Sequence, residues 1–223
     1  MSTQILFIRH GETDWNRIKR IQGHIDIPLA ASGVAQAQRL AVRLAREAKE
    51  GARLDAIYSS DLQRAQQTAQ PFADALGMPL ILNEGLRERS FGAFQGHDSE
   101  EIAQRFPDEY AQWQTRDPGF APPEGESERV FYHRVLHALE PIVAAHPDGR
   151  IACVAHGGVL DCVYRLANGI ALDAPRDYPL LNTSINVVDF DGGKATVVSW
   201  ADVAHLDGCS EDDSFYKKPQ AER

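Results

Sequence analysis

The sequence contains little cysteine. Its 223 residues include only Cys153, Cys162 and Cys209, and no two of these have C-x-x-C spacing. An odd number of widely spaced cysteines does not build a disulfide framework or a zinc site. We therefore expect reduced thiols in a reducing compartment.

An excess of positive charge is also absent. Lysine and arginine number 23 against 32 acidic residues, which gives a formal net charge of −9. Nucleic acids and anionic membrane surfaces attract basic proteins, so neither is expected as the main partner. Any phosphate site in this chain must be a local exception to its overall charge.

Long hydrophobic runs are missing as well. The apolar run Ile5–Ile8 ends at Arg9 and follows no basic leader, so the sequence predicts neither a signal peptide nor a membrane span. We expect a cytoplasmic protein. With 43% hydrophobic residues and no internal repeat, the chain can bury one sizeable core.

What the sequence does contain is an alternation of short β-type runs and amphipathic stretches. Three helices are expected. The first begins at Ser32 and has an apolar face from Val34 to Ala48. The second begins at Ser60 and runs toward Pro71, and the third begins at Ser127 and ends near Ala145. Strands are expected at residues 5–8, 56–59, 80–82 and 151–154, and a terminal hairpin at 187–190 and 196–200.

This alternation predicts an α/β fold. It is a three-layer sandwich in which a mostly parallel sheet carries helices on both faces. One domain is expected over residues 1–207, with an irregular segment of short helices at about 85–126, and residues 208–223 form a polar tail. Such sheets bind ligands beyond the carboxyl ends of their strands.

Two histidine motifs fall at that edge. His10 follows the first strand within Arg9-His10-Gly11, and His156 follows a later strand within His156-Gly157-Gly158. An adjacent arginine and glycines that permit close backbone approach indicate two imidazoles facing a shared anion. Dinucleotide binding is a weaker alternative, because the spaced glycines of that fingerprint are absent.

The other histidines carry weaker signals. His133 and His137 have i, i+4 spacing on a predicted helix, but no third ligand accompanies them, so no metal site is expected. His24, His97 and His146 are interpreted as surface residues, and His205 receives no role.

Four motifs in order resemble the histidine phosphatase superfamily, whose fold is called phosphoglycerate mutase-like. They are Arg9-His10-Gly11-Glu12-Thr13 with Trp15-Asn16, Ser59-Ser60-Asp61-Leu62-Gln63-Arg64-Ala65 with Thr68-Ala69, Leu86-Arg87-Glu88 with Gly92 and Gly96, and Val154-Ala155-His156-Gly157-Gly158. The resemblance spans roughly residues 5 to 205. Four ordered motifs make it specific.

The resemblance implies the roles of the site residues. His10 would attack phosphorus and form a phosphohistidine, while Arg9, Arg64 and His156 hold the phosphoryl oxygens and Glu88 transfers the proton. The remaining binding residues implied by the family pattern are Asn16, Gln22, Gly23 and Gly157. For Gln22 alone, an exposed loop position is an equal alternative. No metal or cofactor is expected.

The predicted function is phosphomonoester hydrolysis on a small phosphorylated metabolite. Phosphoglycerate mutase activity is the first alternative, and a catalytically silent phospholigand-binding module is the second. A mutase needs a dense cationic pocket. Residues 97–128 supply only Arg105 and Arg116 against nine acids, and Pro123-Glu124-Gly125-Glu126-Ser127 resembles the Pro-x-Gly-Glu-Ser stretch of family phosphatases.

Overall fold

A six-stranded sheet forms the centre of the computed structural model, which describes residues 2–207. The strand order is β3-β2-β4-β1-β5-β6. Their bounds are Ser2–Arg9 (β1), Ala56–Ser59 (β2), Leu80–Leu82 (β3), Arg150–Ala155 (β4), Ile185–Asp191 (β5) and Lys194–Asp202 (β6). The first four strands in this order pair in parallel, whereas β5 and β6 are antiparallel and form the predicted terminal hairpin.

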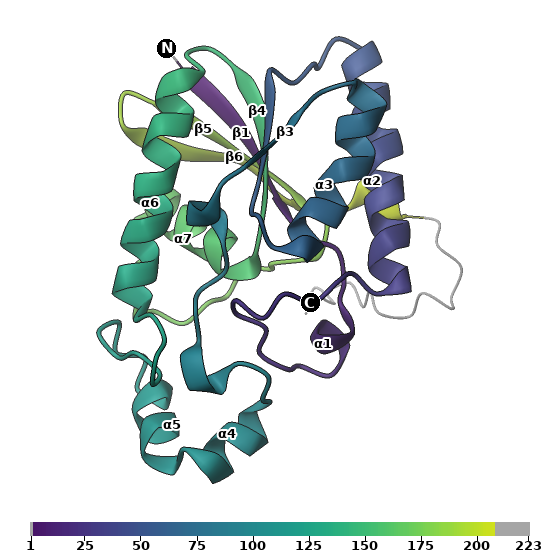
Figure 1. The fold of residues 1–223 in the computed structure, drawn as a ribbon. Helices are drawn as coiled ribbons and strands as arrows, with labels where there is room; N and C mark the ends of the chain where they lie inside the picture. Colours follow the sequence, from purple (N-terminus) through teal and green to yellow (C-terminus); the bar gives the residue numbers. More distant parts are fainter. Residues whose placement is uncertain (1, 208–223) are drawn as a thin grey trace, which may run out of the picture.

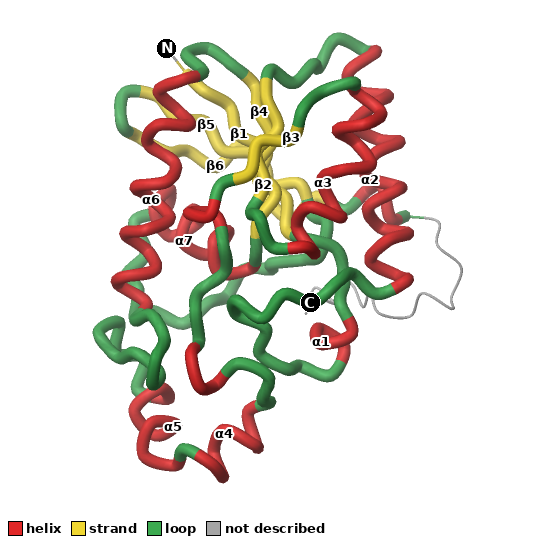
Figure 2. Tube along the Cα trace, viewed as in Figure 1, coloured by secondary structure: helices red, strands yellow, loops and turns green. Residues whose placement is uncertain are grey.

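Helices cover both faces of the sheet, as Figures 1 and 2 show. The bounds of the helices are Asp14–Arg17 (α1), Ala31–Lys49 (α2), Gln63–Leu76 (α3), Ser99–Arg105 (α4), Pro107–Gln114 (α5), Glu128–Ala145 (α6) and Gly157–Asn168 (α7). Short 3-10 turns lie at Glu84–Leu86 (η1), Gly92–Phe94 (η2) and Ala204–Leu206 (η3). Within residues 2–207, no helix is long and apolar enough to cross a membrane.

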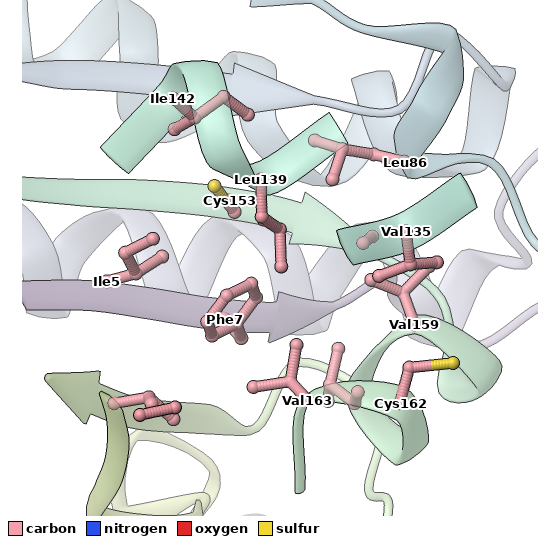
Figure 3. Packing of buried hydrophobic residues seen from close by; sticks show 14 of the residues in the cluster. Ile5, Phe7, Leu86, Val135, Leu139, Ile142, Cys153, Val159, Cys162 and Val163 are labelled. Carbon is pink, nitrogen blue, oxygen red and sulfur yellow. The ribbon is translucent and has the colours of Figure 1, made fainter. Parts of the chain in front are cut away.

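Strand β1 contributes side chains to two hydrophobic cores, one on each face of the sheet. Ile5 and Phe7 face α6 and α7, where they pack with residues such as Leu139 and Val163 (Figure 3). Leu6 and Ile8 belong to the opposite cluster with α2 and α3. All four β1 side chains are fully buried. A strand covered on both faces reads as a continuous apolar run, which is why this element was predictable.

Two predicted helix starts were wrong in detail. Helix α2 begins at Ala31 rather than after Ser32, whose hydroxyl donates to Oε2 of Glu12. Its predicted apolar face also includes Val34, which is exposed, while polar Gln36 is buried and accepts from the peptide N–H of Glu12 at 2.9 Å. Contacts with the loop after β1 therefore override the helix's own pattern.

The helix after β2 also differs from the prediction. The residue that precedes α3 is Leu62, and no side chain caps the helix. The helix passes through Pro71 and ends at Gly77, whose φ of 64° suits a left-handed terminus. Ser60 is thus free of the capping role that its sequence context suggested.

The segment at 85–126 contains the short helices that were expected there. Helices α4 and α5 follow one another below the sheet, in the part of Figure 1 that also holds α1. The polar tail predicted from residue 208 lies outside the described residues.

Candidate active site

The two motif histidines meet at the carboxyl edge of neighbouring strands. Because Arg9 of β1 pairs in register with Ala155 of β4, His10 and His156 both leave the sheet at the same level. The peptide N–H of His10 donates to the Ala155 carbonyl at 2.9 Å. The two ring centroids are 5.2 Å apart, and both side chains are buried.

The His10 ring has a defined tautomer. Its Nδ1 lies 2.7 Å from the Gly11 carbonyl oxygen, which can only accept a hydrogen bond. Nδ1 therefore carries the proton, and Nε2 keeps its lone pair. Burial, followed by the charges of Arg64 and Arg9, holds the pKa of His10 well below 6.5, so the ring is neutral at pH 7.

The loop after β1 is fixed against two helices. The peptide N–H of Gly11 donates to Thr68 Oγ1 of α3 at 2.9 Å. A side chain at Gly11 would place Cβ 2.7 Å from the carbonyl oxygen of Gly33 in α2, so only glycine allows this approach. The backbone next to His10 is thus held in place by the contacts of Gly11 with α2 and α3.

Arg64 lies in the first turn of α3 with its side chain fully buried. Its two Nη atoms donate to the carbonyls of Ile25 and Gly23 at 3.0 and 2.8 Å, and its Nε has no hydrogen-bond partner among the described residues. Burial lowers its pKa to about 10, against the opposing effect of the Glu88 charge. A buried guanidinium faced by carbonyls rather than by a contacting carboxylate favours an anionic ligand.

His156 lies deep beside His10. Its Nε2 is 2.8 Å from the hydroxyl of Ser60, and its Nδ1 has no partner among the described residues. Burial and the charge of Arg64 hold the pKa of His156 well below 6.5. Ser60 therefore orients this ring instead of capping α3, and no sequence pattern indicated that contact.

The Glu88 carboxylate is held by two peptide N–H groups. Oε1 accepts from Arg89 at 2.8 Å, and Oε2 accepts from Gly158 at 3.1 Å, at the amino end of α7. Gly157, the residue before Gly158, lies against the Arg9 side chain, and Nη1 of Arg9 donates to the Leu180 carbonyl. The acid is thereby placed at the same cleft as the histidines.

A polar chain links the remaining predicted residues. Asn16 Oδ1 accepts from the peptide N–H and the hydroxyl of Thr13 at 3.0 and 2.9 Å, and the Gln22 amide donates to the same hydroxyl at 2.8 Å. Gln22 is 8% exposed, so the alternative of an exposed loop position was wrong. Its Oε1 is buried without a partner among the described residues.

Two adjoining cavities collect these side chains. The inner cavity has a volume of about 150 Å³ and is lined by Arg9, His10, Asn16, Gln22, Gly23, Arg64 and Glu88, together with Arg20, Ile21 and Phe91. The outer cavity, about 660 Å³, shares several of these residues and adds Gly157. His156 lines neither cavity but contacts the His10 ring. The predicted set is therefore brought together.

The outer cavity also contains cations that the sequence analysis did not identify: Lys19, Arg20, Arg89 and Arg176. Arg20 donates to Glu101 at 3.0 Å and Arg89 to Glu128 at 2.6 Å. None of them belongs to a motif, and only their positions in space relate them to the site.

The other histidines occupy different environments. His133 and His137 are exposed on α6, and within residues 2–207 no group of three potential metal-binding side chains occurs. His24, His97 and His146, which were interpreted as surface residues, are partly buried, and each has a side-chain hydrogen bond. His205 Nε2 lies 3.3 Å from Thr183 Oγ1, outside both cavities.

Comparisons with known proteins identify relatives of this chain. Phosphoglycerate mutase-like protein 4 of Arabidopsis thaliana is 40% identical over 207 residues, which cover 92% of this chain and 87% of that protein. The metal-independent phosphoserine phosphatase of the same plant is 38% identical, with coverage of 92% and 83%. The structure of Bacillus stearothermophilus YhfR has a TM-score of 0.82 at 34% identity and covers 91% of this chain and 98% of its own. A family model described as histidine phosphatase superfamily (branch 1) matches residues 5–203, so the chain belongs to this superfamily, as its four motifs predicted.

Proposed function

We propose that this chain is a phosphomonoesterase that hydrolyses a small phosphorylated metabolite through a phosphohistidine at His10. The observation that carries the proposal is the His10 tautomer. Its protonated Nδ1 lies 2.7 Å from the Gly11 carbonyl, which leaves Nε2 with a free lone pair. That nitrogen belongs to a neutral ring in a small cavity with two arginines.

In the first step, Nε2 of His10 attacks phosphorus and forms the N–P bond while the bond from phosphorus to the leaving oxygen breaks. Arg9 and Arg64 neutralise the charge on the phosphoryl oxygens. Glu88, in its protonated form, donates its proton to the leaving alcohol oxygen. Its carboxylate lies at the same inner cavity as His10, which supports this role.

His156 supplies a further donor in this scheme. If the Ser60 hydroxyl donates to Nε2, the proton of the neutral His156 ring resides on Nδ1, which has no other partner among the described residues. An N–H at that atom can donate to a phosphoryl oxygen.

In the second step, water attacks the phosphohistidine. Glu88, now a carboxylate, accepts a proton from that water, the N–P bond breaks, and inorganic phosphate leaves. His10 regains its lone pair on Nε2. One carboxylate thus serves both steps because it gains in the second the proton that it loses in the first.

Further elements of the proposal concern metal and location. Catalysis without metal is supported by the relative named as a metal-independent phosphoserine phosphatase and by the arginines around His10. A cytoplasmic location is supported by the few, widely spaced cysteines, and the net charge of −9 disfavours nucleic acid and anionic membranes as partners.

A base-quenched labelling experiment tests the proposal. Incubation with a ³²P-labelled phosphomonoester should leave an acid-labile label on the wild-type chain, and His10→Ala should remain unlabelled. His146→Ala serves as the matched control, since His146 is a partly buried histidine hydrogen-bonded to Tyr58 and outside both cavities. Equal labelling of wild type and His10→Ala would contradict the proposal.

Mutase activity is the second candidate, and one observation favours it. Lys19, Arg20, Arg89 and Arg176 line the outer cavity, so the cleft is more cationic than residues 97–128 alone indicated. A relative named as phosphoglycerate mutase-like points the same way. A silent binding module has no such support, and turnover of p-nitrophenyl phosphate would exclude it.

A further inference from the structure

A three-residue segment, Gly23–His24–Ile25, connects the buried arginine to the proposed acid. The two carbonyls that flank His24 accept both Nη donors of Arg64, at 2.8 Å for Gly23 and 3.0 Å for Ile25. These carbonyls set the position of the buried guanidinium, because within residues 2–207 no carboxylate forms a salt bridge with Arg64.

The side chain of His24 reaches in the other direction. Its Nε2 lies 2.7 Å from the Glu88 carbonyl oxygen. Since that oxygen can only accept, His24 Nε2 donates the hydrogen bond. Arg134 Nη2 donates to the same carbonyl at 3.0 Å, so two side-chain donors from different parts of the chain fix the Glu88 backbone.

The segment has further anchors of its own. The peptide N–H of His24 donates to Gln95 Oε1 at 2.7 Å. Gly23 has φ +50, and a Cβ there would meet the same Gln95 oxygen at 2.1 Å. Arg134 is held in turn by Glu126, through two bonds of 2.8 Å. The His24 contact is therefore one part of an ordered network rather than an isolated surface bond.

We propose that His24 is a positioning residue that sets Glu88 and Arg64 relative to each other. This inference rests on the proposed function, because it assigns Glu88 as the acid and Arg64 as a phosphate contact. His24 lines neither cavity, so it acts through its neighbours and not on the substrate. One residue thereby couples proton transfer to phosphate binding.

His24→Ala should change both properties. A catalytic group displaced by about 1 Å can lose about 10² in rate, so kcat on an alkyl phosphomonoester should fall by about ten- to a hundredfold. The loss on p-nitrophenyl phosphate should be smaller, because its leaving group scarcely needs a proton. The inhibition constant of vanadate should rise several-fold, because Arg64 is less firmly placed.

Two further variants distinguish positioning from general packing. His24→Gln keeps an N–H donor near the position of Nε2. It should therefore restore most of the vanadate affinity and most of the leaving-group ratio, which is kcat on the alkyl phosphomonoester divided by kcat on p-nitrophenyl phosphate. The double variant His24→Ala/Glu88→Gln tests whether His24 acts through Glu88. It should show the same difference in kcat loss between alkyl and p-nitrophenyl phosphates as Glu88→Gln alone.

His146→Ala is the control for loss of a comparable, partly buried hydrogen bond. His146 Nε2 lies 3.0 Å from the Tyr58 hydroxyl, and His146 lines neither cavity. This variant should lower the melting temperature without changing the leaving-group ratio or the vanadate constant. Thermal melts of every variant establish that each one is folded.

Two results would overturn the inference. The first is a His24→Ala variant that is folded and keeps the wild-type leaving-group ratio and vanadate constant. The second is a His24→Gln variant that recovers neither. If the wild type hydrolyses no phosphomonoester, the proposed function fails instead, and calorimetric titration with vanadate still tests the effect of His24 on Arg64: equal affinity in wild type and His24→Ala would refute it.

Discussion

Gly158 donates its peptide N–H to Oε2 of Glu88 at 3.1 Å, which ties the proposed acid to the amino end of α7. The same glycine leaves no room for a side chain. A Cβ at residue 158 would lie 2.2 Å from Glu88 Oε1 and 2.9 Å from Cε1 of the buried Phe131. The position of the carboxylate therefore depends on a residue without a side chain.

The first prediction is that Gly158→Ala displaces Glu88. The carboxylate can move at a lower energetic cost than the buried Phe131 ring, so the substitution should displace Glu88. We expect kcat on alkyl phosphomonoesters to fall by about 10². Overpacking against Phe131 should also lower stability by about 1–3 kcal/mol. Steady-state kinetics and urea unfolding measure the two effects.

Gly157→Ala is the matched comparison for this substitution. The same change one residue earlier would place Cβ no closer than 3.6 Å to Arg9 Nε, an ordinary contact. Its effect on kcat should be clearly smaller. Similar losses in kcat for both variants would contradict the role given to the Gly158 contact.

The second prediction concerns the acid itself. Glu88→Gln keeps the shape of the side chain but cannot transfer the proton, so kcat on substrates with poor leaving groups should fall by about 10² to 10⁴. The loss on p-nitrophenyl phosphate should be smaller. Identical losses on both substrates would count against Glu88 as the proton donor.

The structure also shows which parts of the site were open to prediction from sequence. His10 and His156 lie in local motifs at strand ends, where pattern and element order indicated them, whereas Arg64 and Glu88 were indicated by the resemblance of their segments to family motifs. The mostly parallel sheet followed from the alternation of elements for the same reason. These features depend on residues that are close in sequence.

The features that escaped prediction depend on contacts between distant segments. Ser60 meets His156 across 96 positions, and Arg20 meets Glu101 across 81. His24 was interpreted as a surface residue, and only the fold shows that its side chain contacts the backbone of Glu88, 64 positions away. No local pattern records such pairings, because they arise only when the chain brings its loops to one edge of the sheet.

The third prediction is a pH dependence of stability. Burial holds the pKa of His10 well below 6.5 in the folded protein, whereas the unfolded chain retains the ordinary value. The unfolded state therefore binds the extra proton first as pH falls below 6.5, and the folded state loses stability there. The contribution of one such histidine approaches about 1.4 kcal/mol per pH unit between its two pKa values.

Urea unfolding at pH values from 5 to 7.5 measures this slope. His10→Asn removes one titrating group, so its free energy of unfolding should fall less steeply below pH 6.5 than that of the wild type. His156 keeps part of the slope in that variant, because its pKa is also well below 6.5. Parallel curves for wild type and His10→Asn would rule out the depressed pKa of His10.

The fourth prediction is that a chelator leaves activity intact. Two arginines and the His156 ring supply the donors and charge that the proposed transfer needs, without a metal ion. Activity should be unchanged after EDTA treatment, while vanadate should inhibit competitively as a mimic of the pentacoordinate phosphoryl group. Loss of activity with EDTA and its return with Mg²⁺ would refute this prediction.

The last prediction is that hydrolysis exceeds mutase activity, and it depends on how the cations of the outer cavity are paired. A mutase must hold the carboxylate of glycerate and a second phosphate while its bisphosphorylated intermediate reorients. Here Arg89 is already bound to Glu128 at 2.6 Å and Arg20 to Glu101 at 3.0 Å. These guanidiniums are therefore less available to a second anionic group than their number suggests.

An acid of the same cleft acts in the same direction. Glu88 lines the outer cavity and has no salt-bridge partner among the described residues, so its carboxylate opposes a second anion there. Water should then reach the phosphohistidine before a second hydroxyl does. In ³¹P NMR with 3-phosphoglycerate, inorganic phosphate should accumulate with little 2-phosphoglycerate, with or without added 2,3-bisphosphoglycerate. Interconversion stimulated by the bisphosphate and faster than phosphate release would show instead that Lys19 and Arg176 suffice to hold the second anion, and the chain would then be a mutase.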